Sequence, residues 1–266
     1  MRKKTITHYA LRIIMLTSFD GLVWLVAVLV LLFFLQRILH REIQAILLIG
    51  TRSPGITVGV FALIFFPGVF LHELSHLLTA KLLGVPTGGF SLLPQTMPDG
   101  RLQLGYVEAA ESDIFRDALV GAAPLITGTL LLAFVALERL KLEVMWATLR
   151  NGQWSLFFLG LQSLPHTPDF WLWFYLTFAV SSTMMPSESD QHAFLPIGLL
   201  VGGLLVVALV AGAGPWMFEH LATPLNSFLR GTALVLLVSI IIHAILIVPL
   251  WLIHRIMTRL TGLDVG

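Results

Sequence analysis

The chain has 266 residues, of which 57% are hydrophobic and only 12% are charged, whereas water-soluble domains carry about 25% charged residues. A net charge of +1 without a basic stripe gives no reason to expect nucleic acid as a partner. The lack of cysteine excludes disulfides, thiolate zinc sites and a cysteine nucleophile, so any side-chain metal ligands must be His, Asp or Glu. The composition therefore predicts an integral membrane protein in contact with the lipid bilayer.

Six stretches of the sequence are apolar enough to be membrane spans, since a spanning helix needs about 20 mostly apolar residues. We expect an all-α, multi-pass membrane protein with about six transmembrane helices, at residues 19–39, 55–84, 114–137, 167–185, 194–213 and 231–254. We expect the first to be a retained span, because the apolar run from Gly21 to Leu35 is long and lacks a small-residue cleavage site. Four basic residues precede that run and favour a cytoplasmic N-terminus: Arg2, Lys3, Lys4 and Arg12.

Two stretches between the predicted spans are not continuous apolar runs. Residues 90–93, a turn at Met97-Pro98-Asp99-Gly100 and residues 102–107 predict a small membrane-associated β-hairpin after the second span. Residues 141–165 are apolar but interrupted by polar side chains, so we expect them to lie at the membrane interface without crossing it.

The second predicted span contains the sequence His72-Glu73-Leu74-Ser75-His76. Residues four apart on a helix lie one turn apart on the same face, so His72 and His76 can offer imidazole nitrogens to one ion. Glu73 lies near that face, where it can act as the general base for a metal-activated water. A chance match is the alternative. However, ionisable residues inside a span are costly, which favours a functional role.

A catalytic zinc usually has three protein ligands, so a third must come from another part of the chain. We assign Asp190, because Pro186 should kink or end the fourth predicted span and let the next residues fold back. Spans two, three and four alternate in direction, which brings Asp190 to the end of the second span that carries His72. This assignment fails if residues 141–165 form a full span. A solvated loop carboxylate is the alternative for Asp190, and the competing ligands are Glu188 and His192.

The segment from His72 to Gly84 resembles the longer motif of the site-2 protease family of intramembrane zinc metalloproteases, with Ala80 and Gly84 in the expected places. Residues 116–124 also resemble the family's small-residue segment on the next span. Small side chains there, at Gly121, Ala122 and Ala123, would let helices approach closely.

The sequence departs from the family at the third-ligand motif, where an Asn-and-Pro pattern ending in Asp-Gly is usual. Ser182 stands where the Asn is expected, and Gln191 follows Asp190 in place of Gly.

The resemblance covers roughly residues 55–194 and implies a three-helix catalytic core there. This core would belong to a single membrane domain of residues 1–266, with residues 1–54 as the N-terminal span and loop and residues 195–266 as the C-terminal spans. The resemblance implies Zn²⁺ as the cofactor and a transmembrane or membrane-anchored protein as the substrate, as in regulated intramembrane proteolysis. It also implies cleavage near the cytoplasmic face, and we expect a bacterial cell membrane as the location.

Three points stay open at this level. A substrate helix must unwind before attack, so an extended segment could add a strand to the predicted hairpin, or the hairpin could be a structural cap. The protein could instead be a non-proteolytic metal-binding membrane protein or transporter, in which His72 and His76 handle an ion without hydrolysis. A third possibility is a catalytically dead relative that acts as a binding module.

Overall fold

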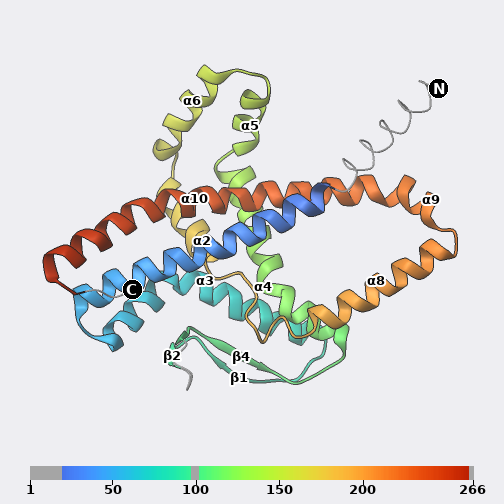
Figure 1. The fold of residues 1–266 in the computed structure, drawn as a ribbon, viewed down its shortest axis with the longest axis horizontal. Coiled ribbons are helices and arrows are strands. Elements are labelled where there is room, and N and C mark those ends of the chain that lie inside the picture. The colour runs from blue at the N-terminus through green and yellow to red at the C-terminus, as the bar shows by residue number, and fades with distance from the viewer. Residues whose placement is uncertain (1–19, 97–101, 264–266) are drawn as a thin grey trace.

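The computed structural model describes residues 20–96 and 102–263 and is built mostly from helices (Figure 1). The helices are α2 (Asp20–Thr51), α3 (Pro54–Leu82), α4 (Ile114–Phe134), the π-helical turn η1 (Val135–Arg139), α5 (Leu142–Arg150), α6 (Trp154–Ser163), the 3₁₀ turn η2 (Leu164–His166), α7 (Phe170–Ser181), α8 (Phe194–Val210), α9 (Gly214–Met217), the π-helical turn η3 (Phe218–Ala222) and α10 (Thr223–Thr261). The strands are β1 (Thr87–Ser91), β2 (Gln95–Thr96), β3 (Leu102–Gln103) and β4 (Tyr106–Ala109). The four basic residues near the N-terminus and the predicted turn at 97–100 lie outside the described residues.

Within the described part of the chain, four helical segments are long and apolar enough to cross a membrane: Asp20–Thr51, Pro54–Leu82, Ile114–Arg139 and Gly214–Thr261. These segments indicate a membrane protein. The other two predicted spans fall on α7 and α8, which are apolar but have 12 and 17 residues. At about 1.5 Å per residue, α7 is roughly 18 Å long, which is less than the roughly 30 Å hydrocarbon core of a bilayer. The prediction of six spans is therefore not confirmed.

The long helices α2 and α10 run side by side along the longest axis of the molecule, with α3 and α4 packed against this pair (Figure 1). One apolar cluster joins α2, α4, α10 and the residues after α7, through Leu32, Leu132, Leu236 and Met184. A second cluster joins α2, α3, α7 and α10, and its members include Leu39, Phe61, Phe65, Phe178 and Ile242. The short helix α7 is thus held among the longer ones.

The limits of α3 follow from its sequence. Pro54 occupies the first helical turn, where a missing N–H costs nothing. The helix ends before Gly84, whose φ of 70° lies in the left-handed region that favours glycine. Within α3, Pro67 has no N–H to donate, so one backbone hydrogen bond of the helix is missing there. Three residues before it, the Ile64 carbonyl accepts a hydrogen bond from the hydroxyl of Tyr175 on α7 (2.9 Å). This contact fixes α7 against α3 about two turns before His72.

Buried polar side chains join α2 to its neighbours. The Glu42 carboxylate is buried and accepts a hydrogen bond from Nδ1 of His254 on α10 (2.6 Å). The Gln36 side chain donates to the backbone carbonyl of Ser181 at the end of α7. A buried polar group without a partner is costly, so these bonds favour one register of α2 against α10 and α7.

Residues 141–165 form a helical hairpin, made of α5 and α6, that projects away from the rest of the molecule (Figure 1). Its helices have 9 and 10 residues and contain no buried residue. Neither is long enough to cross a bilayer, which agrees with the prediction that this segment adds no span. The chain therefore returns to the body of the molecule before α7, as the assignment of Asp190 requires.

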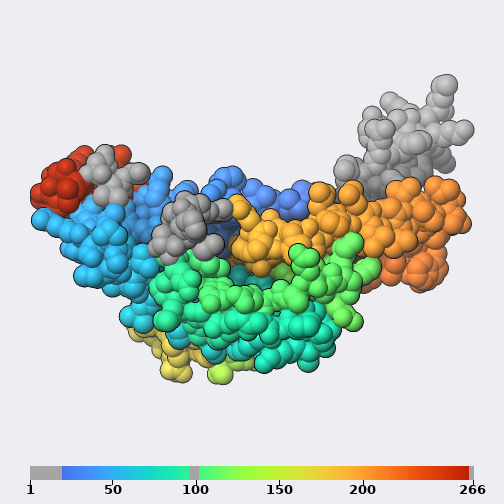
Figure 2. All heavy atoms as spheres, turned by 90° about the horizontal axis from the view of Figure 1, so that it is seen from below, coloured from blue at the N-terminus to red at the C-terminus, as the bar shows by residue number. Residues whose placement is uncertain are grey.

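The predicted β-hairpin is confirmed as antiparallel pairing in two short sheets. Phe90 pairs with Val107 between β1 and β4, and Gln95 pairs with Gln103 between β2 and β3. Leucines of this region pack on the second apolar cluster, at Leu92, Leu102 and Leu104. In Figure 2, the strands and the first turns of α4 (teal and green) lie beside the segment after α7 (orange).

The Glu42–His254 pair yields a stability prediction. Glu42→Ala should lower the free energy of unfolding by about 3 to 5 kcal/mol, because it removes a buried carboxylate and leaves the partly buried His254 imidazole without its charged partner. Denaturant or thermal unfolding in detergent micelles measures this change. The control is Glu138→Ala, which removes an exposed ion pair with Lys141 and should cost about 1 kcal/mol or less. Equal effects of the two substitutions would contradict the prediction.

Candidate metal centre

His72 and His76 lie one turn apart toward the C-terminal end of α3, with Glu73 next to the first of them. Their Nε2 atoms are 3.1 Å apart and their ring centroids are 4.8 Å apart. Both Nε2 atoms therefore face a common position, as the spacing of four residues predicts. The Ser75 hydroxyl donates to the His72 carbonyl (2.7 Å) and lies within the same turn.

The second histidine is oriented by α4. Nδ1 of His76 lies 2.9 Å from the backbone carbonyl of Val120. A carbonyl oxygen only accepts hydrogen bonds, so Nδ1 must carry the proton, and the lone pair of the neutral imidazole is on Nε2. A hydrogen bond from the outer ring nitrogen to a carbonyl is the usual support of a metal-binding histidine.

Asp190 reaches the same position from the segment between α7 and α8. Its carboxylate oxygens lie 3.4 Å from His76 Nε2 and 3.8 Å from His72 Nε2. Ser187 holds this carboxylate in place, since its backbone N–H and its hydroxyl both donate to Oδ2, at 2.7 and 2.6 Å. Burial alone would raise the pKa of Asp190, but the neighbouring His76 imidazole and the hydrogen bonds from Ser187 keep it below its usual value. The carboxyl group is therefore ionised, as a metal ligand must be.

The spacing of these three side chains fits a tetrahedral metal ion. One ligand atom from each lies within 4.8 Å of the others. Zinc bonds to nitrogen and oxygen are about 2.0 to 2.2 Å long, so tetrahedral ligands are roughly 3.3 to 3.5 Å apart. The 3.1 Å between the two Nε2 atoms and the 3.4 Å between His76 Nε2 and Asp190 Oδ1 lie close to this range. Two imidazoles and one carboxylate are also a donor set that zinc accepts, and they leave a fourth position free.

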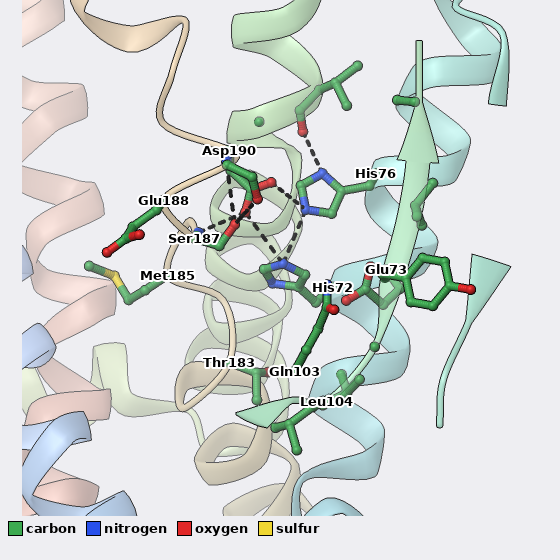
Figure 3. A pocket seen from close by; sticks show the side chains of 18 of the residues that line it. His72, Glu73, His76, Gln103, Leu104, Thr183, Met185, Ser187, Glu188 and Asp190 are labelled. Carbon is green, nitrogen blue, oxygen red and sulfur yellow. Dashed lines mark hydrogen bonds and ion pairs between the residues drawn. The ribbon is translucent and has the colours of Figure 1, made fainter. Parts of the chain in front are cut away.

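A cavity of about 990 Å³ reaches the three side chains and is also lined by Glu73 (Figure 3). The walls come from α2, α3, the first turns of α4, the segment after α7, and residues 102–107 of the hairpin. The cavity therefore leaves room for water and a further ligand beside the three side chains.

The general-base candidate, Glu73, lies against the strand that enters β4. It is buried, and a Cβ atom added to Gly105 would come within 2.9 Å of Glu73 Cγ and 3.0 Å of the Ser91 carbonyl. The absence of a side chain at Gly105 thus lets the strand approach the glutamate closely. Glu73 lies beside this strand and next to His72 (Figure 3).

A second close approach, between Gly121 of α4 and the backbone of Asp190, helps to position Asp190. A Cβ atom added to Gly121 of α4 would overlap the carbonyl oxygen of Asp190. Sequence reasoning gave Gly121 a general role in helix packing. In the structure, its lack of a side chain makes room for the loop that carries the third ligand candidate.

The competing ligand candidates lie apart from this group. Glu188 is exposed and its carboxylate points away from the two imidazoles (Figure 3). His192 is exposed and contacts Asp117 Oδ2 (3.4 Å) and the Ser189 carbonyl (2.5 Å), and these hydrogen bonds raise its pKa. Of the three candidates for the third ligand, the structure brings only Asp190 to the histidines.

Sequence reasoning missed two supporting groups. Ser187 stands three residues before Asp190, and a Ser-x-x-Asp spacing is a known signal for a side-chain to backbone turn. The Val120 carbonyl has no such signal, because any residue supplies a carbonyl and only the packing of α4 on α3 selects this one.

Comparison of the chain with family models, with curated proteins and with solved structures finds no match.

The close approach of the Asp190 backbone to Gly121 yields a prediction. Gly121→Ala should weaken zinc retention about 10- to 100-fold, the usual effect of disturbing the support of a metal ligand, because the new methyl group displaces the Asp190 backbone. Competition with a chromophoric chelator measures this affinity. Gly59→Ala on α3 is the matched control, since a Cβ atom there meets nothing within 4 Å. Unchanged zinc affinity in the Gly121 variant would show that the loop does not depend on this approach.

Proposed function

We propose that this chain is an intramembrane zinc metalloprotease of the site-2 protease type. It would cross the membrane several times and hydrolyse peptide bonds of membrane-embedded protein substrates. The observation that carries the proposal is the convergence of His72, His76 and Asp190 on one point, with a buried carboxylate, Glu73, beside them in a cavity. The resemblance of residues 72–84 to the motif of that family supports the same assignment.

In this proposal His72, His76 and Asp190 hold the ion, and hydrogen bonds support two of these ligands. The Val120 carbonyl orients His76, and Ser187 orients the Asp190 carboxylate. A bound zinc ion would lower the pKa of water and polarise the carbonyl group that is attacked. Glu73 takes the proton from the attacking water and can then pass it to the leaving amine.

The hairpin is the proposed holder of the substrate. A helical substrate has its carbonyls hydrogen-bonded, so the segment to be cut must first become extended. Residues 102–107 line the cavity, and β4 pairs only with β1 among the described strands, so one edge of β4 is open for a further strand. A substrate segment added along this edge would pass Gly105 and therefore Glu73.

The second candidate function is ion handling without hydrolysis, as in a transporter or a metal-binding membrane protein. The ligand geometry serves both functions, so the three ligands do not discriminate between them. Glu73 does, because it is not needed to hold the ion but is needed to move the proton of the attacking water.

The principal test measures metal and cleavage on the same preparations. The purified wild-type protein should hold about one zinc per chain and cleave a membrane-anchored substrate. His72→Ala and Asp190→Ala should lose zinc, because each removes one of three ligands. Glu73→Gln should keep zinc and lose cleavage by at least about 100-fold, the order of a general-base contribution.

The readouts are elemental analysis and mass spectrometry of the cleaved peptide. A Glu73→Gln protein with unchanged activity would favour ion handling. A wild-type protein without stoichiometric metal would remove the enzymatic proposal.

The role of the hairpin is tested with proline. Successive residues of an antiparallel strand direct their N–H groups alternately to the partner strand and to the open edge, so one of Tyr106 and Val107 faces the substrate edge. Proline at that position should slow cleavage about threefold to tenfold, through loss of one backbone hydrogen bond, with zinc content unchanged. Alanine at the same position keeps the N–H and should cleave normally. Normal cleavage by both proline variants would make the hairpin a structural cap.

A further inference from the structure

The cavity beside the ligands also reaches α2. Two of its lining residues, His40 and Gln44, lie four residues apart on that helix and therefore on one face. They are polar side chains on a helix apolar enough to span a membrane, and neither belongs to the proposed catalytic machinery. Polar side chains at such positions are a functional hypothesis by default.

The hydrogen bonding of His40 is incomplete. Its Nε2 atom is buried and has no hydrogen-bond partner among the described residues. The ring packs edge-on against Phe61 and Phe65 of α3, with centroids 5.4 and 4.7 Å away. A buried polar atom without a partner is costly, so a ligand that enters the cavity and pairs with this nitrogen gains by doing so.

The distance from His40 and Gln44 to the proposed site of cleavage can be estimated along α3 and along the hairpin. Along α3, Phe65 and Phe61 precede His72 by 7 and 11 residues, which at about 1.5 Å per residue is roughly 10 to 17 Å. Along the hairpin, Gly105 touches Glu73, and Leu102 packs on the cluster that contains Phe61 and Phe65. Three residues of extended chain are about 10 Å long, so the chain from Gly105 to Leu102 leads from Glu73 towards the cluster on which His40 packs.

The surroundings define the chemistry of the ligand. A neutral imidazole and a primary amide each offer a donor and an acceptor. Four cavity-lining residues belong to the apolar cluster and carry no charge: Phe61, Val69, Leu102 and Leu104. Gln103, between the two leucines, also lines the cavity and is polar but uncharged. The site therefore suits an uncharged polar group that both donates and accepts.

We propose that His40 and Gln44 form a specificity subsite that binds an Asn, Gln, Ser or Thr side chain of the substrate. An extended peptide advances about 3.3 Å per residue, so this side chain lies about three to five residues from the bond that is cut. The inference rests on the proposed proteolytic function, because it assumes that a substrate chain lies in the cavity. It assigns substrate selection to α2, whereas the ligands come from α3 and the segment after α7.

The test uses synthetic single-span Leu/Ala peptides that carry either Gln or Leu at one scanned position on each side of the cleaved bond. Zinc-loaded wild-type protein should prefer Gln about threefold to tenfold in kcat/KM at one position, about three to five residues from that bond. His40→Phe should abolish this preference and leave zinc content and cleavage of the Leu peptide unchanged. Gln44→Leu should reduce it. The control is His220→Phe, which changes an exposed histidine that does not line the cavity.

Two failures can be distinguished. If the zinc-loaded wild-type protein cleaves none of the peptides, the proposed function is wrong, and so is the proposal of a specificity subsite. If it cleaves the Gln and Leu peptides equally, prefers Asp or Glu, or keeps its preference for Gln in His40→Phe, the subsite is wrong and the protease stands.

A second measurement does not need turnover. The chain has no cysteine, so His40→Cys in a Glu73→Gln background has a single thiol. Under mild oxidation it should form a disulfide with a peptide whose cysteine is about three to five residues from the mapped bond, and with no peptide whose cysteine is at the bond itself. Equal cross-linking along the peptide would overturn the subsite.

Discussion

Three groups that carry lone pairs face one point inside an apolar helix bundle, and a positive charge between them would be strongly favoured. The nitrogens of His72 and His76 and the Asp190 carboxylate lie within 4.8 Å of one another. In a medium of low dielectric constant, mutual repulsion of such groups is strong unless a cation compensates it. A bound ion would also tie α3 to the segment after α7, two parts of the chain that are distant in sequence. Metal binding would then contribute to the fold as well as to the chemistry.

The helix α4 supports this arrangement through its backbone at two consecutive residues. The carbonyl of Val120 orients the His76 ring, and the missing side chain of Gly121 lets the Asp190 loop approach. A small rotation of α4 would disturb both at once. The packing of α4 on α3 is therefore a condition of the site, although α4 supplies none of the three ligands. The same logic applies to Gly105, whose lack of a side chain lets the hairpin reach Glu73.

Much of this arrangement can be predicted from sequence because it depends on local spacing. The His72–His76 interval fixes two ligands on one helical face, and residues 90–107 show the alternation and turn residues of a hairpin. The span count could not be predicted in the same way, because hydropathy measures apolar character and not length: α7 ends after 12 residues. The supports of the ligands were also missed in part. The carbonyl of Val120 is selected by tertiary packing, which leaves no mark on residue identity.

In the proposed function, hydrolysis within a lipid layer needs water, an ion and an extended substrate in one place, and the cavity would bring these together. Its walls combine the metal ligands, the open strand edge and the face of α2 that carries His40. The catalytic core that the sequence predicts begins near residue 55, so α2 lies outside it. In the proposed function, α3 and the segment after α7 therefore carry out the chemistry, and α2 selects the substrate. Substitutions on the cavity face of α2 could change the choice of substrate without moving any ligand of the ion.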